Sequence, residues 1–247
     1  MSKISLFLRS IIYDIFICFW SFLIPVLYSK SFITKDRKLA DRGAKKWAKV
    51  AISALEKICN IKYEIRGLEN LPQKSGFLVA SKHQSMWDTI ILMSFFNQPA
   101  YAWKKELTKI PFYGWFITVM SGITVDREGG AKALKHLLNE SKKYFDNGQN
   151  VVIFPQGTRT KIGDKTEEYP YQPGVAAIYN HCKVPVVPVA LNSGIYWNKK
   201  DTKAPGTIIL EFLPPIELGL DKKTFMDRLE KAIEDKADEL CKKPTNK

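Results

Sequence analysis

The chain has 247 residues, and its 38 Lys and Arg against 25 Asp and Glu give a formal net charge of +13. This length suits one large α/β domain with an appendage, and the charge favours an anionic partner. We expect that partner to be membrane phospholipid and not nucleic acid, because no nucleic-acid motif is present and basic residues are densest beside an apolar N-terminus. Three histidines, and four cysteines without metal-like or C-x-x-C spacing, predict no metal site and a reduced, cytosol-facing protein.

The first predicted element is an apolar helix over residues 4–28. Arg9 and Asp14 interrupt its first half, and 15–27 carries no charge. A signal peptide is disfavoured because Tyr28 and the residues after it form no small-x-small cleavage site. The uncharged part is shorter than the ~20 residues of a full span. A single span and a helix embedded in one leaflet therefore both remain open.

A second helix is predicted over residues 35–60, with one apolar stripe and one basic side. It suits either a membrane-surface helix or an ordinary helix packed on a core with a solvated basic face. Together, the two helices predict a membrane-anchoring unit, 1–60, before an α/β domain, 61–241, and a loose tail, 242–247. The basic residues also predict the cytoplasmic face of the cell's inner membrane as the location of the domain.

From residue 61 onward, strand and helix patterns alternate. The predicted strands are 61–67, 76–81, 100–103, 122–126, 150–154, 185–191 and 207–213, and the predicted helices are 86–97, 131–146, 174–181 and 221–241. This alternation is typical of an α/β fold with a mainly parallel sheet flanked by helices.

The most informative stretch is the turn between the strand 76–81 and the helix 86–97. Ser85 occupies an N-cap position and Asp88 follows three residues later, as in a capping box. Asp88 can then reach back to His83, fix its tautomer and leave the other ring nitrogen free to take a proton. The pattern predicts either a His/Asp general base or a surface histidine beside a helix cap.

Two further turns follow predicted strands. Gln156, Gly157, Thr158 and Arg159 come after the strand 150–154, where glycine lets backbone amides approach an anion and the guanidinium can grip phosphate. Asp126 and Arg127 end the strand 122–126 and suit either the same site or a local salt bridge. In parallel sheets ligands gather at the carboxyl ends of strands, so His83, Arg127 and Arg159 are expected at one edge.

These segments resemble, in order and spacing, the motifs of the glycerolipid acyltransferases, a family marked by a His-x4-Asp motif. His83 to Asp88 is similar to the first motif, 122–127 to the second, 154–159 to the third and 184–189 to the fourth. The resemblance covers about residues 61–215 and is nearest to the bacterial branch that acts on 1-acylglycerol 3-phosphate. The segment from Lys104 to Gly114 also resembles the stretch before the second motif, and could line an acyl pocket or belong to the core.

The resemblance implies a function and a role for each matching residue. His83 would deprotonate the sn-2 hydroxyl of lysophosphatidic acid, which attacks a thioester of acyl-carrier protein or coenzyme A to give phosphatidic acid. Asp88 would orient His83, while Arg127, Arg159 and the Gly157-Thr158 backbone would bind phosphate. Asp126, Gln156 and Lys104 belong to the same expected substrate site, and no cofactor, metal or covalent acyl-enzyme is expected.

One residue departs from the family pattern. The third motif usually reads Phe-Pro-Glu-Gly-Thr-Arg, and this chain has Gln156 for the glutamate. Glutamine keeps the hydrogen-bonding capacity and loses the charge. The same chemistry on a different acceptor, such as glycerol 3-phosphate or a lyso-aminolipid, therefore stays open. A membrane-bound thioester or lipid hydrolase and a non-catalytic lipid-binding protein are the competing functions.

Overall fold

The computed structural model describes residues 3–109, 114, 122–126, 129–164, 166–197 and 202–242. Within these residues seven strands form one sheet, in the order β1-β7-β6-β2-β5-β3-β4. All neighbours are parallel except β6 and β7, which are antiparallel. The predicted mainly parallel sheet is confirmed.

The strands match the predicted segments to within a few residues. In chain order they are β1 (Ile61–Arg66), β2 (Leu78–Ser81), β3 (Ala100–Lys104), β4 (Gly122–Val125), β5 (Val151–Ile153), β6 (Val186–Leu191) and β7 (Gly206–Phe212).

The helices include every predicted one. They are α1 (Lys3–Leu27), α2 (Lys30–Thr34), α3 (Arg37–Cys59), α4 (Met86–Phe95), α6 (Gly130–Asp146), α7 (Gly174–Cys182), α8 (Ser193–Tyr196) and α9 (Lys222–Lys242), with 3-10 turns at Leu68–Asn70 and Lys105–Lys109. The short elements α2 and α8 have too few residues to show a periodic pattern in the sequence.

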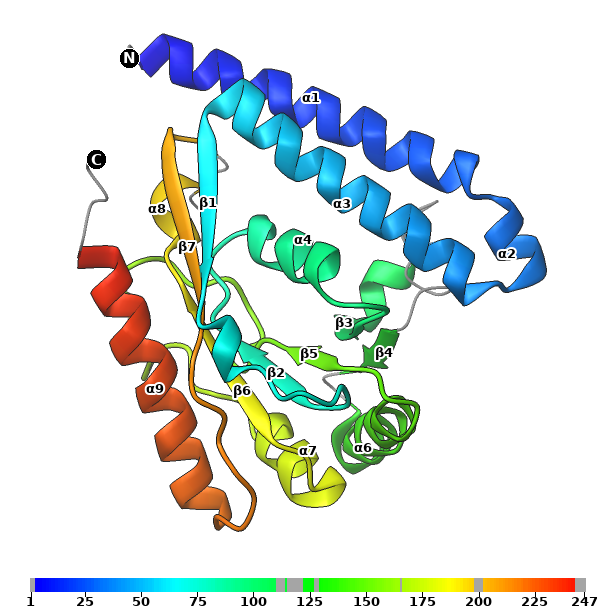
Figure 1. Ribbon diagram of the computed structural model, residues 1–247, viewed down its shortest axis with the longest axis vertical. Coiled ribbons are helices and arrows are strands. Elements are labelled where there is room, and N and C mark those ends of the chain that lie inside the picture. The colour runs from blue at the N-terminus through cyan, green and yellow to red at the C-terminus, as the bar shows by residue number, and fades with distance from the viewer. Residues whose placement is uncertain are drawn as a thin grey trace.

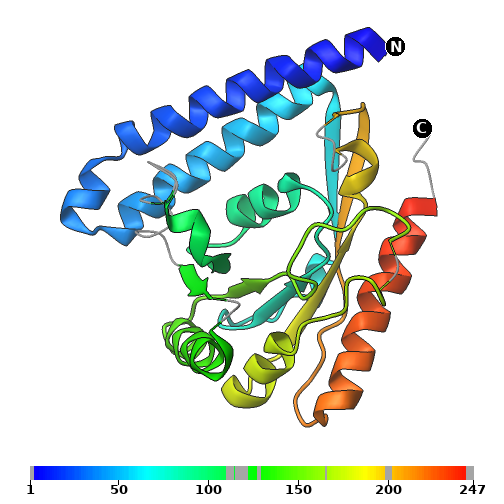
Figure 2. The ribbon, with the colours of Figure 1, turned by 180° about the vertical axis from the view of Figure 1, so that it is seen from behind.

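The helices cover the sheet on both faces (Figures 1 and 2). Alternate residues of the inner strands point to opposite faces, so Val79 packs with α3 and α4, whereas Leu78 and Ala80 pack with α6, α7 and α9. The inner strands are apolar on both faces, as parallel strands buried under two helix layers should be.

The N-terminal helices form a hairpin in which α1 runs beside α3 (Figure 1). The Tyr13 hydroxyl donates to the carbonyl of Ala51 at 3.3 Å, and the indole of Trp47 donates to Ser21 at 3.0 Å. Gly43 of α3 permits close approach, because a Cβ there would lie 2.8 Å from the ring of Tyr28.

The apolar stripe of α3 is buried between α1 and α4, and its charged side faces outward. The apolar side of this helix is therefore packed on a protein core and does not face a membrane. The hairpin shares a hydrophobic cluster with the sheet. The division of the chain at residues 60/61 and 241/242 into an anchor, a domain and a tail stays a prediction.

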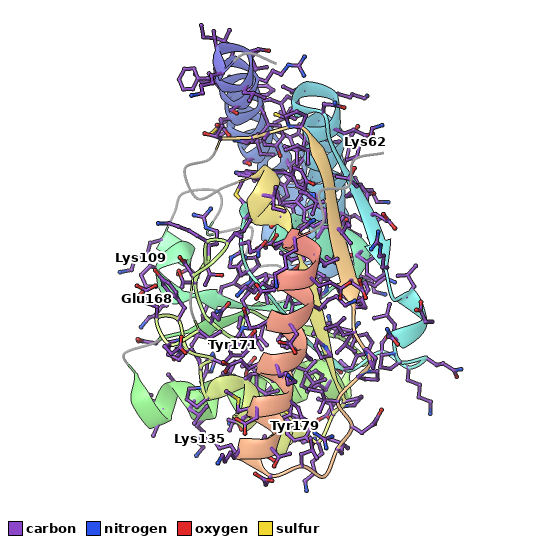
Figure 3. All side chains as sticks on the ribbon, turned by 90° about the vertical axis from the view of Figure 1, so that its left-hand side faces the viewer. Lys62, Lys109, Lys135, Glu168, Tyr171 and Tyr179 are labelled. Carbon is purple, nitrogen blue, oxygen red and sulfur yellow. The ribbon has the colours of Figure 1, made fainter. Side chains whose placement is uncertain are left out.

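The C-terminal helix α9 covers the opposite face of the sheet. Figure 3 looks onto α9 and labels Tyr171 and Tyr179, which both contact it. The Tyr179 ring stacks on Phe225 with ring centroids 4.0 Å apart, and the Tyr171 hydroxyl donates to Glu234 at 2.8 Å.

Candidate active site

His83 leaves the sheet at the carboxyl end of a central strand. β2 pairs with β6 on one side and β5 on the other, and the ladder continues one residue further, where the Lys82 N–H donates to the carbonyl of Val189 at 2.9 Å. α4 then begins at Met86, with Ser85 and Asp88 forming the predicted capping box. The imidazole is therefore held between a fixed strand end and a fixed helix start.

Asp88 joins the helix cap to the imidazole. Its Oδ2 atom lies 3.0 Å from Nδ1 of His83 and accepts the backbone N–H groups of Gln84 at 2.7 Å and Ser85 at 2.8 Å. The Asp88 side chain is completely buried, whereas that of His83 is 16% exposed. The predicted proximity of His83 and Asp88 is confirmed.

This geometry fixes the tautomer of the imidazole. Asp88 Oδ2 accepts two backbone donors, so the proton shared with His83 is assigned to Nδ1. Nε2 of His83 has no hydrogen-bond partner among the residues that the structure describes. Its lone pair is therefore available to take a proton from a bound molecule.

The loop after β5 packs directly onto His83. The ring of Phe154 stacks on the imidazole, with centroids 4.0 Å apart and an interplanar angle of 18°. The N–H and hydroxyl of Thr160 both donate to the His83 carbonyl, at 2.9 and 3.3 Å. The structure thus brings the segment 154–160 against the His83 turn.

Within that loop, Gln156 and Arg159 have hydrogen-bonding groups without a partner among the described residues. Gln156 is buried, its Nε2 donates to the Tyr169 carbonyl at 3.2 Å, and its Oε1 has no partner among the described residues. Arg159 is half-buried and forms no hydrogen bond or ion pair with the described part of the chain. Gly157, at φ 67°, makes the tight turn that precedes half-buried Thr158.

The expected residues on β3 and β4 are only partly placed. Asp126 pairs with Lys105 at 3.0 Å at the exposed end of β4, a partner that the sequence did not suggest. β4 lies three strands from β2, about 14 Å at 4.8 Å per strand. Lys104 ends β3, but its side chain and the whole of Arg127 lie outside the described residues.

Sequence reasoning missed a buried ion pair next to His83. Lys82 is 4% exposed, and its Nζ lies 2.8 and 2.6 Å from the two carboxylate oxygens of Glu234 on α9. Burial, and after it the charge of Glu234, raise the pKa of Tyr171 well above its usual range, so Tyr171 remains a donor to Glu234. No sequence signal pairs residues 152 positions apart.

Phe154 and Thr160, which also contact the His83 turn, were missed as well. Phe154 could have been found, because it ends the predicted strand 150–154 and begins the segment that resembles the third motif. Thr160 has no such signal. Among the described residues, no three His, Cys, Asp or Glu side chains gather as metal ligands would.

A family model of acyltransferases matches residues 62–192, which is more than half of the chain. The chain belongs to the acyltransferase family. The matched segment contains His83, Asp88 and the loop from Phe154 to Thr160, whereas Glu234 lies outside it.

Among the relatives of this acyltransferase are two bacterial proteins named 1-acyl-sn-glycerol-3-phosphate acyltransferase. The one from Pseudomonas aeruginosa is 38% identical over 163 residues, 66% of this chain and 62% of the relative. The one from Helicobacter pylori is 34% identical over 154 residues, 59% and 63% respectively. The aligned part of the chain thus spans just under two thirds of the length of these relatives.

A solved structure has the same fold as this acyltransferase along nearly its whole length. It is the crystal structure of the 1-acyl-sn-glycerophosphate (LPA) acyltransferase, PlsC, from Thermotoga maritima. The TM-score is 0.77 at 24% identity, and the match covers 97% of this chain and 99% of the other. The predicted fold class, including the apolar N-terminal helix, agrees with this neighbour.

Proposed function

We propose that this acyltransferase transfers an acyl chain from a thioester to the sn-2 hydroxyl of lysophosphatidic acid, giving phosphatidic acid for phospholipid synthesis. The observation that carries the proposal is the His83–Asp88 pair, in which Nδ1 is occupied by a buried carboxylate and Nε2 is open. The names of the aligned relatives support the choice of acceptor.

In the proposed reaction, His83 acts as general base. Nε2 takes the proton of the acceptor hydroxyl while its oxygen attacks the thioester carbonyl. The new C–O bond forms, the C–S bond breaks, and the proton passes from Nε2 to the departing sulfur. Asp88 stabilises the imidazolium that exists between these two transfers, and a thioester needs little further activation.

Arg159 supplies the cation for the acceptor's phosphate. It is half-buried and unpaired within the described residues, and its loop is bonded to the His83 turn through Thr160. A guanidinium can bind phosphate through two parallel hydrogen bonds. The Gly157-Thr158 backbone, Arg127 and Lys104 complete the proposed phosphate site. Within that backbone the Thr158 N–H is the proposed donor, because the Gly157 N–H donates to the Phe154 carbonyl at 2.8 Å.

Gln156 fits a role in holding the acceptor. The Tyr169 carbonyl can only accept a hydrogen bond, so the Gln156 amide presents its NH₂ group there and its Oε1 elsewhere. A buried carbonyl oxygen without a partner is unfavourable until a donor arrives. An acceptor hydroxyl is such a donor. Because Gln156 is neutral, glycerol 3-phosphate or a lyso-aminolipid is kept as the alternative acceptor for the same chemistry.

The donor is a thioester of acyl-carrier protein or coenzyme A, and the proposed reaction uses no cofactor or metal. Each proton that moves is taken and returned by His83, and the leaving sulfur needs no redox partner.

We also propose that the enzyme lies on the cytoplasmic face of the inner membrane, with α1 in one leaflet. Within the described residues, α1 is the one helix long and apolar enough to cross a membrane. However, α1 packs along α3, whose outer side carries Arg42, Lys46 and Lys49. A spanning α1 would draw these charges into hydrocarbon, whereas an α1 parallel to the surface leaves them at the headgroups.

The test is acyl transfer from a labelled thioester, with lysophosphatidic acid and glycerol 3-phosphate as parallel acceptors. We expect labelled phosphatidic acid from the wild type, and a loss of about 100-fold or more in His83→Ala. Free fatty acid that forms without an acceptor would instead indicate a hydrolase. Full activity of His83→Ala would refute the role of the base.

A further inference from the structure

The carboxylate that holds His83 is itself held by a serine from a distant part of the chain. Ser193 is the first residue of α8, directly after β6, and is completely buried. Its Oγ lies 2.5 Å from Oδ1 of Asp88, although the two residues are 105 positions apart. We propose that Ser193 is a positioning residue for the His83–Asp88 pair. This proposal rests on the proposed function of that pair as the base.

The hydroxyls around Asp88 form a short directed chain. Ser85 Oγ lies 2.8 Å from Ser193 Oγ and 3.1 Å from Asp88 Oδ1. A hydroxyl has one proton to donate and two lone pairs. Ser193 therefore donates a hydrogen bond to Asp88 while it accepts one from Ser85, and accepting that hydrogen bond polarises its O–H group toward the carboxylate.

Ser193 completes the hydrogen bonding of a carboxylate that has no access to water. Oδ2 of Asp88 already serves three donors, namely His83 Nδ1 and the N–H groups of Gln84 and Ser85. Oδ1 accepts the proton of Ser193, whereas the Ser85 hydroxyl, whose proton points to Ser193, lies farther from Oδ1, at 3.1 Å. Without Ser193, Oδ1 keeps one longer contact, and rotation of the carboxylate meets less resistance. Such rotation moves Oδ2 away from the imidazole.

The backbone around Ser193 is fixed independently of its hydroxyl. The side chain of Asn192 accepts from the Ile209 N–H at 2.8 Å and donates to the Leu240 carbonyl at 3.3 Å. The N–H of Gly194 donates to Oε1 of Gln84 at 3.0 Å. Removal of the Ser193 hydroxyl therefore leaves the turn in place, so its effect is expected on the orientation of Asp88.

The first experiment compares Ser193→Ala with a matched control, Ser141→Ala, in full-length enzyme. Ser141 is also completely buried, on α6, but its hydroxyl has no partner among the described residues. We expect Ser193→Ala to lower kcat about tenfold, with KM for thioester and acceptor changed by less than about twofold. Ser141→Ala should match the wild type.

The second experiment follows the Nδ1 proton of His83 by NMR in protein with ¹⁵N-labelled histidine. The chain has three histidines, and His83→Gln identifies the resonance. We expect this resonance to move in Ser193→Ala and to stay in place in Ser141→Ala. An unchanged kcat together with an unmoved resonance would overturn the proposal. A fall in kcat that is fully explained by a smaller fraction of folded protein would also overturn the proposal.

The two readouts separate this proposal from the proposed function. If the wild type transfers no acyl group, the proposed function fails, and the resonance alone decides whether Ser193 positions the pair. If transfer occurs and the resonance does not move, the function stands and the role of Ser193 is refuted.

Discussion

The two long terminal helices, α1 and α9, are fastened to the sheet domain by the same device but have opposite outer surfaces. In each case a buried lysine of the domain reaches a carboxylate on the helix. Lys203 Nζ lies 2.6 Å from Asp14 of α1, and Lys82 Nζ lies 2.6 Å from Glu234 of α9. Lys203 also lies over the rings of Tyr13 and Trp197.

The outer faces differ in kind. α9 buries its apolar residues, which are Phe225, Leu229, Ile233, Ala237 and Leu240, and shows mainly charged residues to solvent. α1 leaves its large apolar residues uncovered, among them Ile4, Phe7, Leu8, Ile12, Ile15, Phe19 and Phe22, each more than half exposed. A contiguous apolar surface of this kind is a sign of a membrane or protein partner. The outer face of α9 therefore suits contact with water, and the outer face of α1 suits contact with an apolar medium.

The sharpest way to break this comparison is to make the outer face of α1 polar. Phe7, Ile15 and Phe19 are each at least 60% exposed. Each contributes about 1.5–3 kcal/mol when it enters hydrocarbon, so changing all three to Ser should weaken vesicle binding by about 100-fold or more. Co-sedimentation with anionic phospholipid vesicles measures this.

The matched control lies on the outer face of α9. Lys231→Ser with Asp235→Ser removes an exposed ion pair and leaves the net charge unchanged. It should bind vesicles like the wild type. Full retention of the α1 triple variant on vesicles would refute the proposed membrane face.

The second prediction compares the two buried lysines. Lys82→Met leaves Glu234, 20% exposed, without its cation and should lower the free energy of unfolding by about 3–5 kcal/mol. Lys203→Met should cost less, about 1–2 kcal/mol, because Asp14 is 45% exposed and can turn to water. Denaturant unfolding in detergent measures both values.

Activity adds a second contrast between the same variants. Lys82 precedes His83 in the chain, so Lys82→Met should also lower kcat, whereas Lys203→Met should leave it nearly unchanged. Lys231→Met, which breaks an exposed pair, should cost less than about 1 kcal/mol and serves as the control. Equal losses for Lys82→Met and Lys203→Met would contradict the comparison.

The third prediction concerns two thiols of the hairpin and affects neither membrane binding nor stability. Cys18 is exposed on α1, whereas burial raises the pKa of the buried Cys59 on α3 to about 11. The thiolate is the reactive form, so at about pH 8 Cys59 has roughly 100-fold less of it than an ordinary cysteine. Because the folded pKa lies above the working pH, its reaction rate should rise about tenfold per pH unit until about pH 11.

Mass spectrometry after brief reaction with N-ethylmaleimide in mild detergent measures this difference. We expect Cys18 to be modified first, and Cys59 to react at the rate of an ordinary cysteine only after denaturation. Equal rates at about pH 8 in folded protein would show that α3 does not shield Cys59.

The features that could be predicted from the sequence are those determined by interactions between residues close together in the chain. The strand before Lys82, the cap at Ser85 and the return of Asp88 to His83 all lie within a few residues, where periodicity and capping rules apply. Even here Pro188 is an exception, because it lies inside an inner strand, whereas proline is usually confined to strand starts, edges and bulges. The backbone of Pro188 faces the irregular segment after β7. The N–H of Leu213 in that segment donates to the Pro188 carbonyl at 2.9 Å.

What could not be predicted depends on contacts between distant segments. Ser193 and Glu234 meet the His83 turn only because β6 lies beside β2 and α9 covers that face, and neither residue has a local pattern that sets it apart. The surroundings of Asp126 depend on such contacts as well. Strand order places it at the end of the edge strand β4, where it pairs with Lys105, and its part in substrate binding stays a prediction.

Asp88 has two structural roles, and this has a consequence for how proteins of this family can diverge. The same carboxylate caps α4 and holds the imidazole, so folding alone is a reason to keep it. His83 has no such second role, because within the described residues its side chain forms a hydrogen bond with Asp88 alone. If His83 is the base, as proposed, a descendant that abandons acyl transfer can lose the histidine and still keep the aspartate for its fold. Under that proposal, a surviving aspartate in this motif marks an inherited scaffold, and a surviving histidine marks a working enzyme.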